Sequence, residues 1–462
     1  MLCVLMNCFH DGNGGCIMSE QVTIIMPVYN PGEYLRPCLD SLLAQSMKDF
    51  RIIAIDDGST DNSWDVLQEY AAQDARVLPQ KNPYNIGAAR TRNIGIQLAQ
   101  GEYVVILDAD DYFEPDYLEC LWTACKENDL DIAICDFYWR DEYTASEFEY
   151  YPSCRFRGVI DQVFQYTDMK DYIFQLFISV PFIKMYKRDF LLSFSLQFQD
   201  ISNSNDIYFG QISLIYAKRI LHINKALVHY RYNTGCQIST NRYKNPECAF
   251  FAFLNIYKAL VMNKLLDSVK RSFYVLVVTS VLGIADKMDS DAKKIFLENW
   301  NKNCFALFGM CNLKNEEFYA DYTYEAWKYL AVGGVWSNTI DVIKMKQNAY
   351  ASFFAEVRKR GCKVAHWGYG KLGKQFACQA VEYGVEIAEI YDRDSSKWGM
   401  YDGVPIKSFL DKSCNIDFVV MTNAIFEKDI KLQCKKIQSN IKIFDFDAYL
   451  NFGLDWDECV VL

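Results

Sequence analysis

Histidine and positive charge are both scarce in this sequence of 462 residues. The four histidines, His10, His222, His229 and His366, are too dispersed to predict a metal site built from imidazole ligands. Aspartate and glutamate number 59 against 48 lysines and arginines, so the formal net charge is −11. Nucleic acid is strongly negative, and proteins that bind it carry clustered positive charge. The acidic balance therefore argues against a nucleic acid partner.

The sequence also lacks a paired cysteine motif and a long apolar run. Its 17 cysteines include no Cys-x-x-Cys spacing and are odd in number, which suits a reducing cytosol better than secretion. The best candidate for a membrane span, 273–285, is shorter than the roughly 18 residues that cross a bilayer, so we expect a buried helix there. Residues 1–17 have no basic leader, and Met18 is a second candidate start. We expect a cytoplasmic protein, with any peripheral membrane contact at the inner face of the membrane.

The composition, with 51% hydrophobic residues, is that of a globular protein. The sequence also contains one distinctive acidic cluster. The apolar run 103–107 has no polar alternation, which predicts a strand buried on both faces. Asp108, Asp110 and Asp111 follow it at once. Carboxylates this close repel one another unless a cation lies among them, and hard oxygen ligands favour Mg²⁺, Mn²⁺ or Ca²⁺. The alternative is a solvated acidic turn in which Asp110 or Asp111 caps the next helix.

Strands and helices alternate along the first part of the chain. Apolar runs that predict strands occur at 22–26, 51–55, 77–78 and 103–107, and helical patterns separate them. This alternation predicts a doubly wound parallel sheet, in which ligands bind outside the carboxyl ends of the strands. Polar clusters follow three of the strands, and we expect them to converge on one crevice; they lie at 27–30, 56–59 and 108–111.

Six short motifs support this interpretation. In chain order they are Pro-Val-Tyr-Asn at 27–30, Asp-Asp-Gly-Ser-Thr-Asp at 56–61, Asn-x-Gly at 85–87, Arg-Asn-x-Gly at 92–95, Gly-Glu-Tyr at 101–103 and Asp-Ala-Asp-Asp at 108–111. With them, residues 22–136 resemble the nucleotide-binding half of a family 2 glycosyltransferase with the GT-A fold. One departure is Thr91, where the family usually has alanine.

The resemblance implies a role for each of several residues toward a nucleotide-sugar donor. Pro27, Tyr29 and Asp57 would hold the base, with Asp57 accepting a hydrogen bond from the ring N–H. Asp108 would meet the ribose, and Asp110 would coordinate Mn²⁺ or Mg²⁺ between the two phosphates. The alternatives are structural: Tyr29 as an ordinary core residue, and the acidic side chains at 56 and 61 as turn and cap residues.

Two arginines and a second carboxylate complete the implied site. Arg92 would support the acidic loop or approach the diphosphate; otherwise it is a surface ion pair. Arg231 matches a Tyr-Arg pair in a segment that approaches the diphosphate. Asp206 matches the base that deprotonates the acceptor hydroxyl, although Asn205 stands before it where the family commonly has glutamate. The alternative for Asp206 is a helix N-cap.

Beyond the GT-A domain, the chain has a helical region and a small α/β domain, and short tails lie at both ends. We expect a tail at 1–17, the GT-A domain at 18–240, a helical region at 241–360, a small Rossmann-like α/β domain at 361–451 and a tail at 452–462. The last domain has a Gly-x-Gly-x-x-Gly turn between a strand and a helix, which indicates a second nucleotide site at Gly368, Gly370, Gly373 and Asp392. A docking or regulatory role is the alternative.

The predicted function is that of a metal-dependent, inverting glycosyltransferase of the hexosyltransferase type. It would move a sugar from a nucleotide-sugar donor, a UDP-sugar, to a hydroxyl of a glycan or lipid-linked glycan acceptor in bacterial-type cell-surface polysaccharide or glycoconjugate synthesis. A nucleotidyltransferase with the same fold is disfavoured because no Gly-x-Gly-Thr-Arg loop lies near the first strand. A nucleotide-sensing or scaffold protein with a degenerate transferase half is the alternative from another class. The intact acidic residues count against it, and Asn205 leaves it open.

Overall fold

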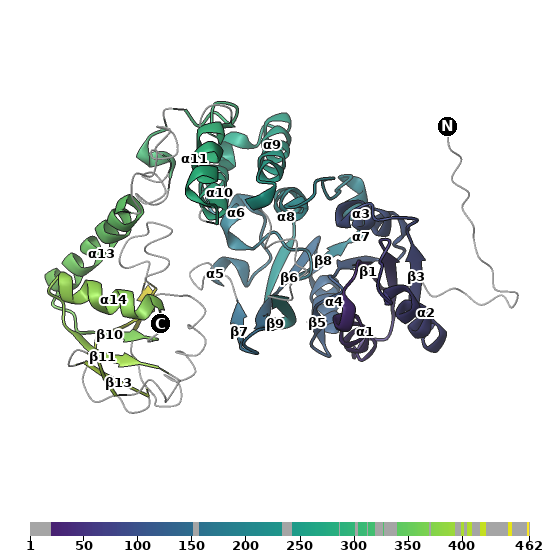
Figure 1. Ribbon diagram of the computed structural model, residues 1–462, viewed down its shortest axis with the longest axis horizontal. Coiled ribbons are helices and arrows are strands. Elements are labelled where there is room, and N and C mark those ends of the chain that lie inside the picture. Colours follow the sequence, from purple (N-terminus) through teal and green to yellow (C-terminus); the bar gives the residue numbers. More distant parts are fainter. Residues whose placement is uncertain are drawn as a thin grey trace, which may run out of the picture.

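Two β-sheets organise the chain in the computed structural model (Figure 1). The predicted α/β fold class is confirmed: a GT-A domain comes first, helices follow, and a small α/β unit lies at the C-terminal end. The structure describes residues 20–150, 157–232, 243–285, 287–300, 304–311, 313–318, 327, 340–368, 371–392, 399–401, 404–408, 416–421, 442–445 and 460–461.

The first half of the larger sheet is parallel, as the sequence predicts. Its strands in spatial order are β3 (Val77–Lys81), β2 (Phe50–Asp56), β1 (Val22–Val28) and β4 (Tyr103–Ile106). All four residues of β4 are buried, because a parallel strand in the middle of an α/β layer is covered on both faces. The connecting helices are α1 (Leu35–Leu43), α2 (Ser63–Gln73) and α3 (Ala88–Leu98).

The second half of the sheet is mixed. β8 (Lys184–Lys187) pairs antiparallel with β4 and with β6 (Ile132–Asp141), and β6 runs parallel to β9 (Ile220–Tyr232). The end of β6 pairs with its antiparallel partner β7 (Glu147–Tyr150), and 151–156 lie outside the described residues. The short β5 (Tyr112–Phe113) pairs with β9. The intervening helices are α4 (Tyr117–Asn128), α5 (Arg157–Ile160), α6 (Ile173–Leu176), α7 (Arg188–Ser193) and α8 (Asn205–Tyr216).

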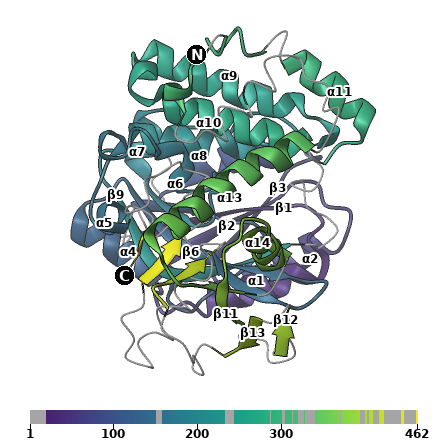
Figure 2. The ribbon, with the colours of Figure 1, turned by 90° about the vertical axis from the view of Figure 1, so that its left-hand side faces the viewer.

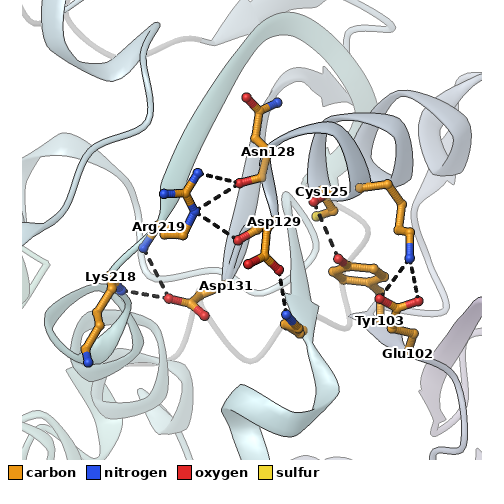
Figure 3. A network of polar contacts seen from close by, with 10 residues as sticks. Glu102, Tyr103, Cys125, Asn128, Asp129, Asp131, Lys218 and Arg219 are labelled. Carbon is orange, nitrogen blue, oxygen red and sulfur yellow. Dashed lines mark hydrogen bonds and ion pairs between the residues drawn. The ribbon is translucent and has the colours of Figure 1, made fainter.

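A polar network ties the elements together at the amino ends of β4, β6 and β9 (Figure 3). Arg219 donates hydrogen bonds to the carbonyl oxygens of Asn128 and Asp129, where α4 ends. The Asp131 carboxylate accepts from the backbone N–H groups of Lys218 and Arg219 at 2.8 and 3.1 Å. These contacts satisfy groups that the end of α4 and the chain reversals leave open.

Helices dominate the next region of the chain. They are α9 (Glu247–Met262), α10 (Leu266–Ala285), α11 (Ser290–Asn299) and α13 (Ile340–Arg360). α10 has 20 residues, more than the apolar stretch of the sequence suggested, and by length and composition it could cross a membrane. However, 61% of its most apolar window is buried inside the protein, as expected for the predicted buried helix.

The second sheet has the strand order of a dinucleotide-binding fold. Its five parallel strands lie in the order β13, β11, β10, β14, β15, and two short antiparallel strands flank them. Phe353 of α13 packs on Phe376 of α14 and on Phe444 of β15, with ring centroids 5.8 and 4.9 Å apart, so α13 shares the core of this unit (Figures 1 and 2). The bounds are β10 (Val364–Trp367), α14 (Lys371–Glu382), β11 (Ile387–Tyr391), β12 (Gly399–Tyr401), β13 (Val404–Lys407), β14 (Phe418–Met421), β15 (Lys442–Asp445) and β16 (Val460–Val461).

Candidate active site

A cavity of about 1430 Å³ lies at the carboxyl ends of β1, β2 and β4. It is the crevice that the sequence predicts, because three of the polar clusters that follow strands contribute to its wall. The residues predicted for donor, metal and acceptor that line it are Pro27, Tyr29, Asp57, Arg92, Asp108, Asp110 and Asp206. Arg231, the remaining predicted residue of this site, is not among the lining residues.

The loops after β1 and β2 are joined by short polar contacts. Asn30 adopts a left-handed backbone conformation, with φ of 49°, and its side-chain oxygen accepts hydrogen bonds from the N–H groups of Thr60 and Asp61. Asp61 in turn accepts from the N–H of Gly32 at 3.1 Å. Tyr29, beside this junction, is 51% exposed, so the alternative in which it is an ordinary core residue is wrong.

Asp57 is buried and shapes the loop 82–87. Its carboxylate accepts hydrogen bonds from the Asn82 side chain at 2.8 Å and from the N–H groups of Ile86 and Gly87 at 3.0 and 2.9 Å. Gly58 follows with φ of 73°, and a Cβ there would lie 2.6 Å from the Asn85 nitrogen. A carboxylate has about four lone-pair sites, so three loop donors leave one for a ligand. The predicted contact of Asp57 with the base stays a prediction.

The contacts of Thr91 explain why this chain has threonine where the family usually has alanine. The Asn82 amide donates one hydrogen bond to Asp57 and the other to the Thr91 hydroxyl, at 3.1 Å. Thr91 is fully buried, so this hydroxyl satisfies an amide hydrogen that would otherwise lack a partner. The sequence marked the position as unusual without indicating the partner.

Arg92 connects the donor and acceptor sides of the cavity. One guanidinium nitrogen lies 2.6 Å from the Asp108 carboxylate, and another donates to the Asn205 side-chain oxygen at 3.1 Å. The group also packs over the Phe198 ring. At 8% exposure Arg92 is no surface ion pair, and its contact with Asp108 is the support of the acidic loop that one of the two predicted roles requires.

The acidic cluster is electrostatically unfavourable as it stands, with Asp111 fully buried and Asp108 and Asp110 half-buried. Burial raises the pKa of Asp110 to about 6, and the neighbouring Asp108 adds to the effect. Burial, followed by Asp110 and Asp108, also holds the pKa of Asp111 well above its usual range. One Asp111 oxygen accepts from the Arg231 N–H at 2.9 Å, and the other has no hydrogen-bond partner within the described ranges. Neither Asp110 nor Asp111 caps a helix, because α4 has Asp116 at its N-cap.

The donor set of this cluster fits a divalent cation. The described part of the chain holds no complete cage of three or more ligating side chains. Mg²⁺ and similar ions are usually held by one or two carboxylates together with substrate phosphates, so a full cage is not required. A cation beside Asp110 would offset the effect of burial and the repulsion by Asp108, which together raise the pKa of Asp110. Asp110, with Asp108 next to it, is therefore suited to the predicted role.

Arg231 lies behind the acidic cluster rather than on the cavity wall. Its guanidinium is placed between the Tyr34 and Tyr112 rings, 4.9 and 4.8 Å from their centroids, and its Nε is 3.4 Å from Glu142. Its positive charge opposes the rise in the pKa of Asp110 and Asp111. The predicted approach of Arg231 to a diphosphate stays a prediction.

Asp206 occupies the second position of α8 and lines the cavity. The N-cap of that helix is Ser204, and its side chain makes no capping hydrogen bond. The alternative in which Asp206 is the N-cap is therefore wrong. It lines the same cavity as Asp108 and Asp110, and its predicted role as a base stays a prediction.

Lys184, which the sequence interpretation missed, is buried close to Asp206. Its ammonium donates to the carbonyl oxygens of Ile178 and Val180 at 2.9 and 2.7 Å, in a segment that lines the cavity. Burial lowers the pKa of Lys184 to about 7, and the negative charge of Asp206 acts against this shift. A lone lysine in the apolar run 180–186 was the signal available in the sequence.

The second predicted nucleotide site is described only in part. Gly368 has φ of 90°, and a Cβ on Gly373 would lie 1.9 Å from the Gly368 oxygen, so both glycines are needed for close packing of β10 and α14. Asp392 directly follows β11, and Gly370 lies outside the described residues. This packing accounts for Gly368 and Gly373 without a ligand, and nucleotide binding here stays a prediction.

The fold and the cavity define a class: enzymes of the GT-A fold that transfer a group at the carboxyl edge of a parallel sheet. Residues 23–193 match the model of the family described as Glycosyl transferase family 2. Glycosyltransferase GlyG of Streptococcus pneumoniae is 32% identical over 233 residues, which cover 48% of this chain and 74% of GlyG. The chain belongs to glycosyltransferase family 2 and is a glycosyltransferase.

Other relatives are similar over different shares of their length. Glycosyltransferase GlyA of S. pneumoniae is 30% identical over 225 residues, which cover 47% of this chain and 32% of GlyA. The chain thus spans about a third of that relative. Among solved structures, S. aureus TarS 1–349 in complex with UDP-GlcNAc has a TM-score of 0.46 and 15% identity, and the match covers 71% of this chain and 92% of that one.

Proposed function

We propose that this protein is an inverting, metal-dependent hexosyltransferase that moves a sugar from a UDP-sugar to an acceptor hydroxyl. The observation that carries the proposal is the placement of Asp206 on the same cavity as Asp108 and Asp110. Arg92 joins the two sides through Asp108 and Asn205. A base on one side of a cavity, with a site for a nucleotide diphosphate on the other, is the arrangement that single-step transfer requires.

Different residues of the chain have different roles in the proposed reaction. Asp206 accepts the proton of the acceptor hydroxyl as the hydroxyl oxygen forms a bond to the anomeric carbon. The bond from that carbon to the diphosphate oxygen breaks, its electron pair leaves with the nucleoside diphosphate, and the configuration inverts. Asp110, with Asp108, would hold the divalent cation, which when bound supplies Lewis-acid stabilisation of the leaving group. Arg92 keeps Asp108 in place throughout.

The cellular setting is also a proposal. We place the protein in the cytoplasm, at the inner face of the membrane, in cell-surface polysaccharide or glycoconjugate synthesis. The support is chemical: the eight cysteines whose side chains the structure describes are free thiols, which suits a reducing compartment. The net charge of −11 makes a purely electrostatic attachment to an acidic membrane unfavourable.

Diphosphate release from a panel of nucleotide sugars with Mn²⁺ tests the proposed function. We expect slow, metal-dependent hydrolysis of at least one UDP-sugar by the purified protein, because water replaces the absent acceptor. The Asp110→Asn variant should lose this release. If no nucleotide sugar is hydrolysed and none binds, the transferase proposal fails, and a scaffold with a degenerate transferase half takes its place.

A further inference from the structure

The cavity extends well beyond the space that a nucleotide needs. Small-molecule pockets commonly measure about 300–1,000 Å³, and this one is about 1430 Å³. Past Asp206, its wall is formed by the end of β6, the segment 174–182, the end of β9 and α10. This part, which we call the acceptor half, lies on the side of the proposed base. It is therefore where a second substrate would place its hydroxyl.

Aromatic side chains held by one another form much of the acceptor half. Trp139 meets the Tyr230 ring edge-on, with centroids 4.9 Å apart, and the Tyr232 ring edge-on at 5.4 Å. Tyr230 stacks on Phe182 at 5.1 Å. Trp139, Tyr230 and Tyr232 are only partly buried, so they are fixed by packing yet present a surface to the cavity. A pyranose has one face of C–H groups, and a rigid aromatic surface of this kind is complementary to it.

The acceptor half carries little positive charge. Among the described lining residues of the whole cavity, the basic side chains are Arg92, which is paired with Asp108, and Lys287. The nearby Lys184 ammonium is directed at two backbone carbonyls. The other polar groups on this side are neutral amides and hydroxyls, together with Asp206 and Asp200. Recognition of a phosphate ordinarily uses several arginine or lysine contacts.

We propose that the acceptor is an uncharged sugar, whose C–H face lies on the aromatic surface formed by Trp139, Tyr230 and Tyr232. A polyol-phosphate chain would meet the Asp206 carboxylate, and Arg90, the cation beside Asp200, is already paired with that carboxylate. An apolar group attached to the sugar can extend along Leu276 of α10, which lines the same half. The inference rests on the proposed function, because it assigns Asp206 to the acceptor.

The test compares acceptors in the presence of Mn²⁺ and whichever nucleotide sugar the protein hydrolyses. The neutral probes are octyl β-glucoside, octyl β-galactoside and octyl N-acetyl-β-glucosaminide, and the charged probe is a ribitol phosphate oligomer. We expect saturable transfer to at least one octyl glycoside and none to the oligomer. Transfer to the oligomer with none to any glycoside would overturn the inference.

Variants of Trp139 test the contact itself. The Trp139→Ala change should raise the acceptor KM about tenfold, while the donor KM and acceptor-independent diphosphate release stay within about twofold. Trp139→Phe, which keeps an aromatic face, should recover most of the loss. Trp122→Ala, in α4 and outside the cavity, is the matched control and should leave the acceptor KM unchanged.

The outcomes separate the inference from the proposed function. An unchanged acceptor KM in a folded Trp139→Ala variant overturns the aromatic contact while transfer chemistry stands. If Trp139→Ala does not fold, Trp139→Phe and the acceptor preference of the unmodified protein decide the matter. Absence of donor hydrolysis and donor binding would instead remove the proposed function, and this inference with it.

Discussion

The two ends of the larger sheet differ in whether their carboxylates are paired with lysine or arginine. At the amino ends of β4, β6 and β9, Glu102 is paired with Lys126 at 2.9 Å, and Asp129 with Lys187 at 2.7 Å (Figure 3). At the carboxyl end of β4, three acidic side chains within four residues share one close ion pair within the described ranges, that of Asp108 with Arg92. Paired charges hold the fold together at the first end. Charge that lacks a partner at the second end is available to a ligand.

Strand β8 shows the same contrast within four residues. Lys187, at the end with paired charges, has its pKa raised by its hydrogen bond with Asp129. Lys184, at the cavity end, has its pKa lowered to about 7 by burial. One strand thus carries two lysines whose environments shift their pKa values in opposite directions. The difference comes from position in the fold, because the two residues are of the same type and nearly adjacent.

The largest effect is expected at Asp206. Asp206→Asn removes the proton acceptor but keeps the shape, so transfer should fall about 10²–10⁴-fold. Nucleotide affinity and thermal unfolding should stay close to those of the unmodified protein, since Asp206 does not cap α8. Transfer assays and UDP titrations on the same preparation provide the measurement. Transfer at the unmodified rate would place the base elsewhere.

A smaller loss is expected when Arg92 becomes lysine. The planar guanidinium bonds Asp108 and Asn205 at once, whereas an ammonium on a shorter reach cannot reproduce that fork. We expect kcat/KM to fall about tenfold, which corresponds to about 1.4 kcal/mol. The control is Arg90→Lys on the same helix, whose exposed pair with Asp200 should contribute little. Equal effects in the two variants would contradict the bridging role.

The two lysines of β8 predict different pH dependences of stability. The unfolded chain keeps the Lys184 proton up to a pH near 10.5, and the folded protein keeps it only to about 7. Between these values the unfolded state binds more protons, so the free energy of unfolding should rise with pH by up to about 1.4 kcal/mol per unit.

The measurement is urea unfolding at pH 7, 8 and 9, with each variant compared with the unmodified protein. Lys184→Met should remove the rising contribution. Lys187→Met should leave the profile over pH 7–9 unchanged, because stability from a raised pKa is fully present below the ordinary lysine value of 10.5 and is lost only at higher pH. Identical pH profiles for the two variants would show that the two ends do not differ.

The smallest expected effect is on the stability of the metal-free protein. There, two changes of aspartate to asparagine should shift the free energy of unfolding in opposite directions. Asp110→Asn removes a buried charge that Asp108 repels, and it should stabilise the metal-free protein by about 0.5–1.5 kcal/mol. Asp131→Asn weakens the bonds that the carboxylate accepts from two backbone N–H groups, so it should destabilise by a similar amount. Chemical denaturation with a chelator present measures both. Destabilisation by both changes would mean that the acidic cluster is satisfied as it stands.

Much of the fold was predictable because apolar runs and glycine turns are local signals. The apolar runs 22–26, 51–55 and 103–107 predicted three parallel strands, and the polar residues after them indicated the cavity. The antiparallel half was harder to predict. β8 has only four residues, and its place between β4 and β6 depends on contacts distant in the chain.

The partners of the site residues could not be predicted from the sequence. Arg92 and Asn205 are 113 positions apart, and only the fold brings them within 3.1 Å. The Asn-x-Gly motif at 85–87 marked the loop, but it did not indicate that the N–H groups of Ile86 and Gly87 hold Asp57. A residue type can indicate what a site does. Which groups hold that residue in position depends on the packing of the folded chain.

Metal-dependent binding of UDP is the measurement that tests the contrast between the two ends most directly. Calorimetric titrations with and without Mn²⁺ would compare the unmodified protein, Asp110→Asn and Asp131→Asn. We predict that Mn²⁺ strengthens UDP binding in the unmodified protein and in Asp131→Asn, and that it has no effect in Asp110→Asn. The same gain with Mn²⁺ in Asp110→Asn would contradict the account.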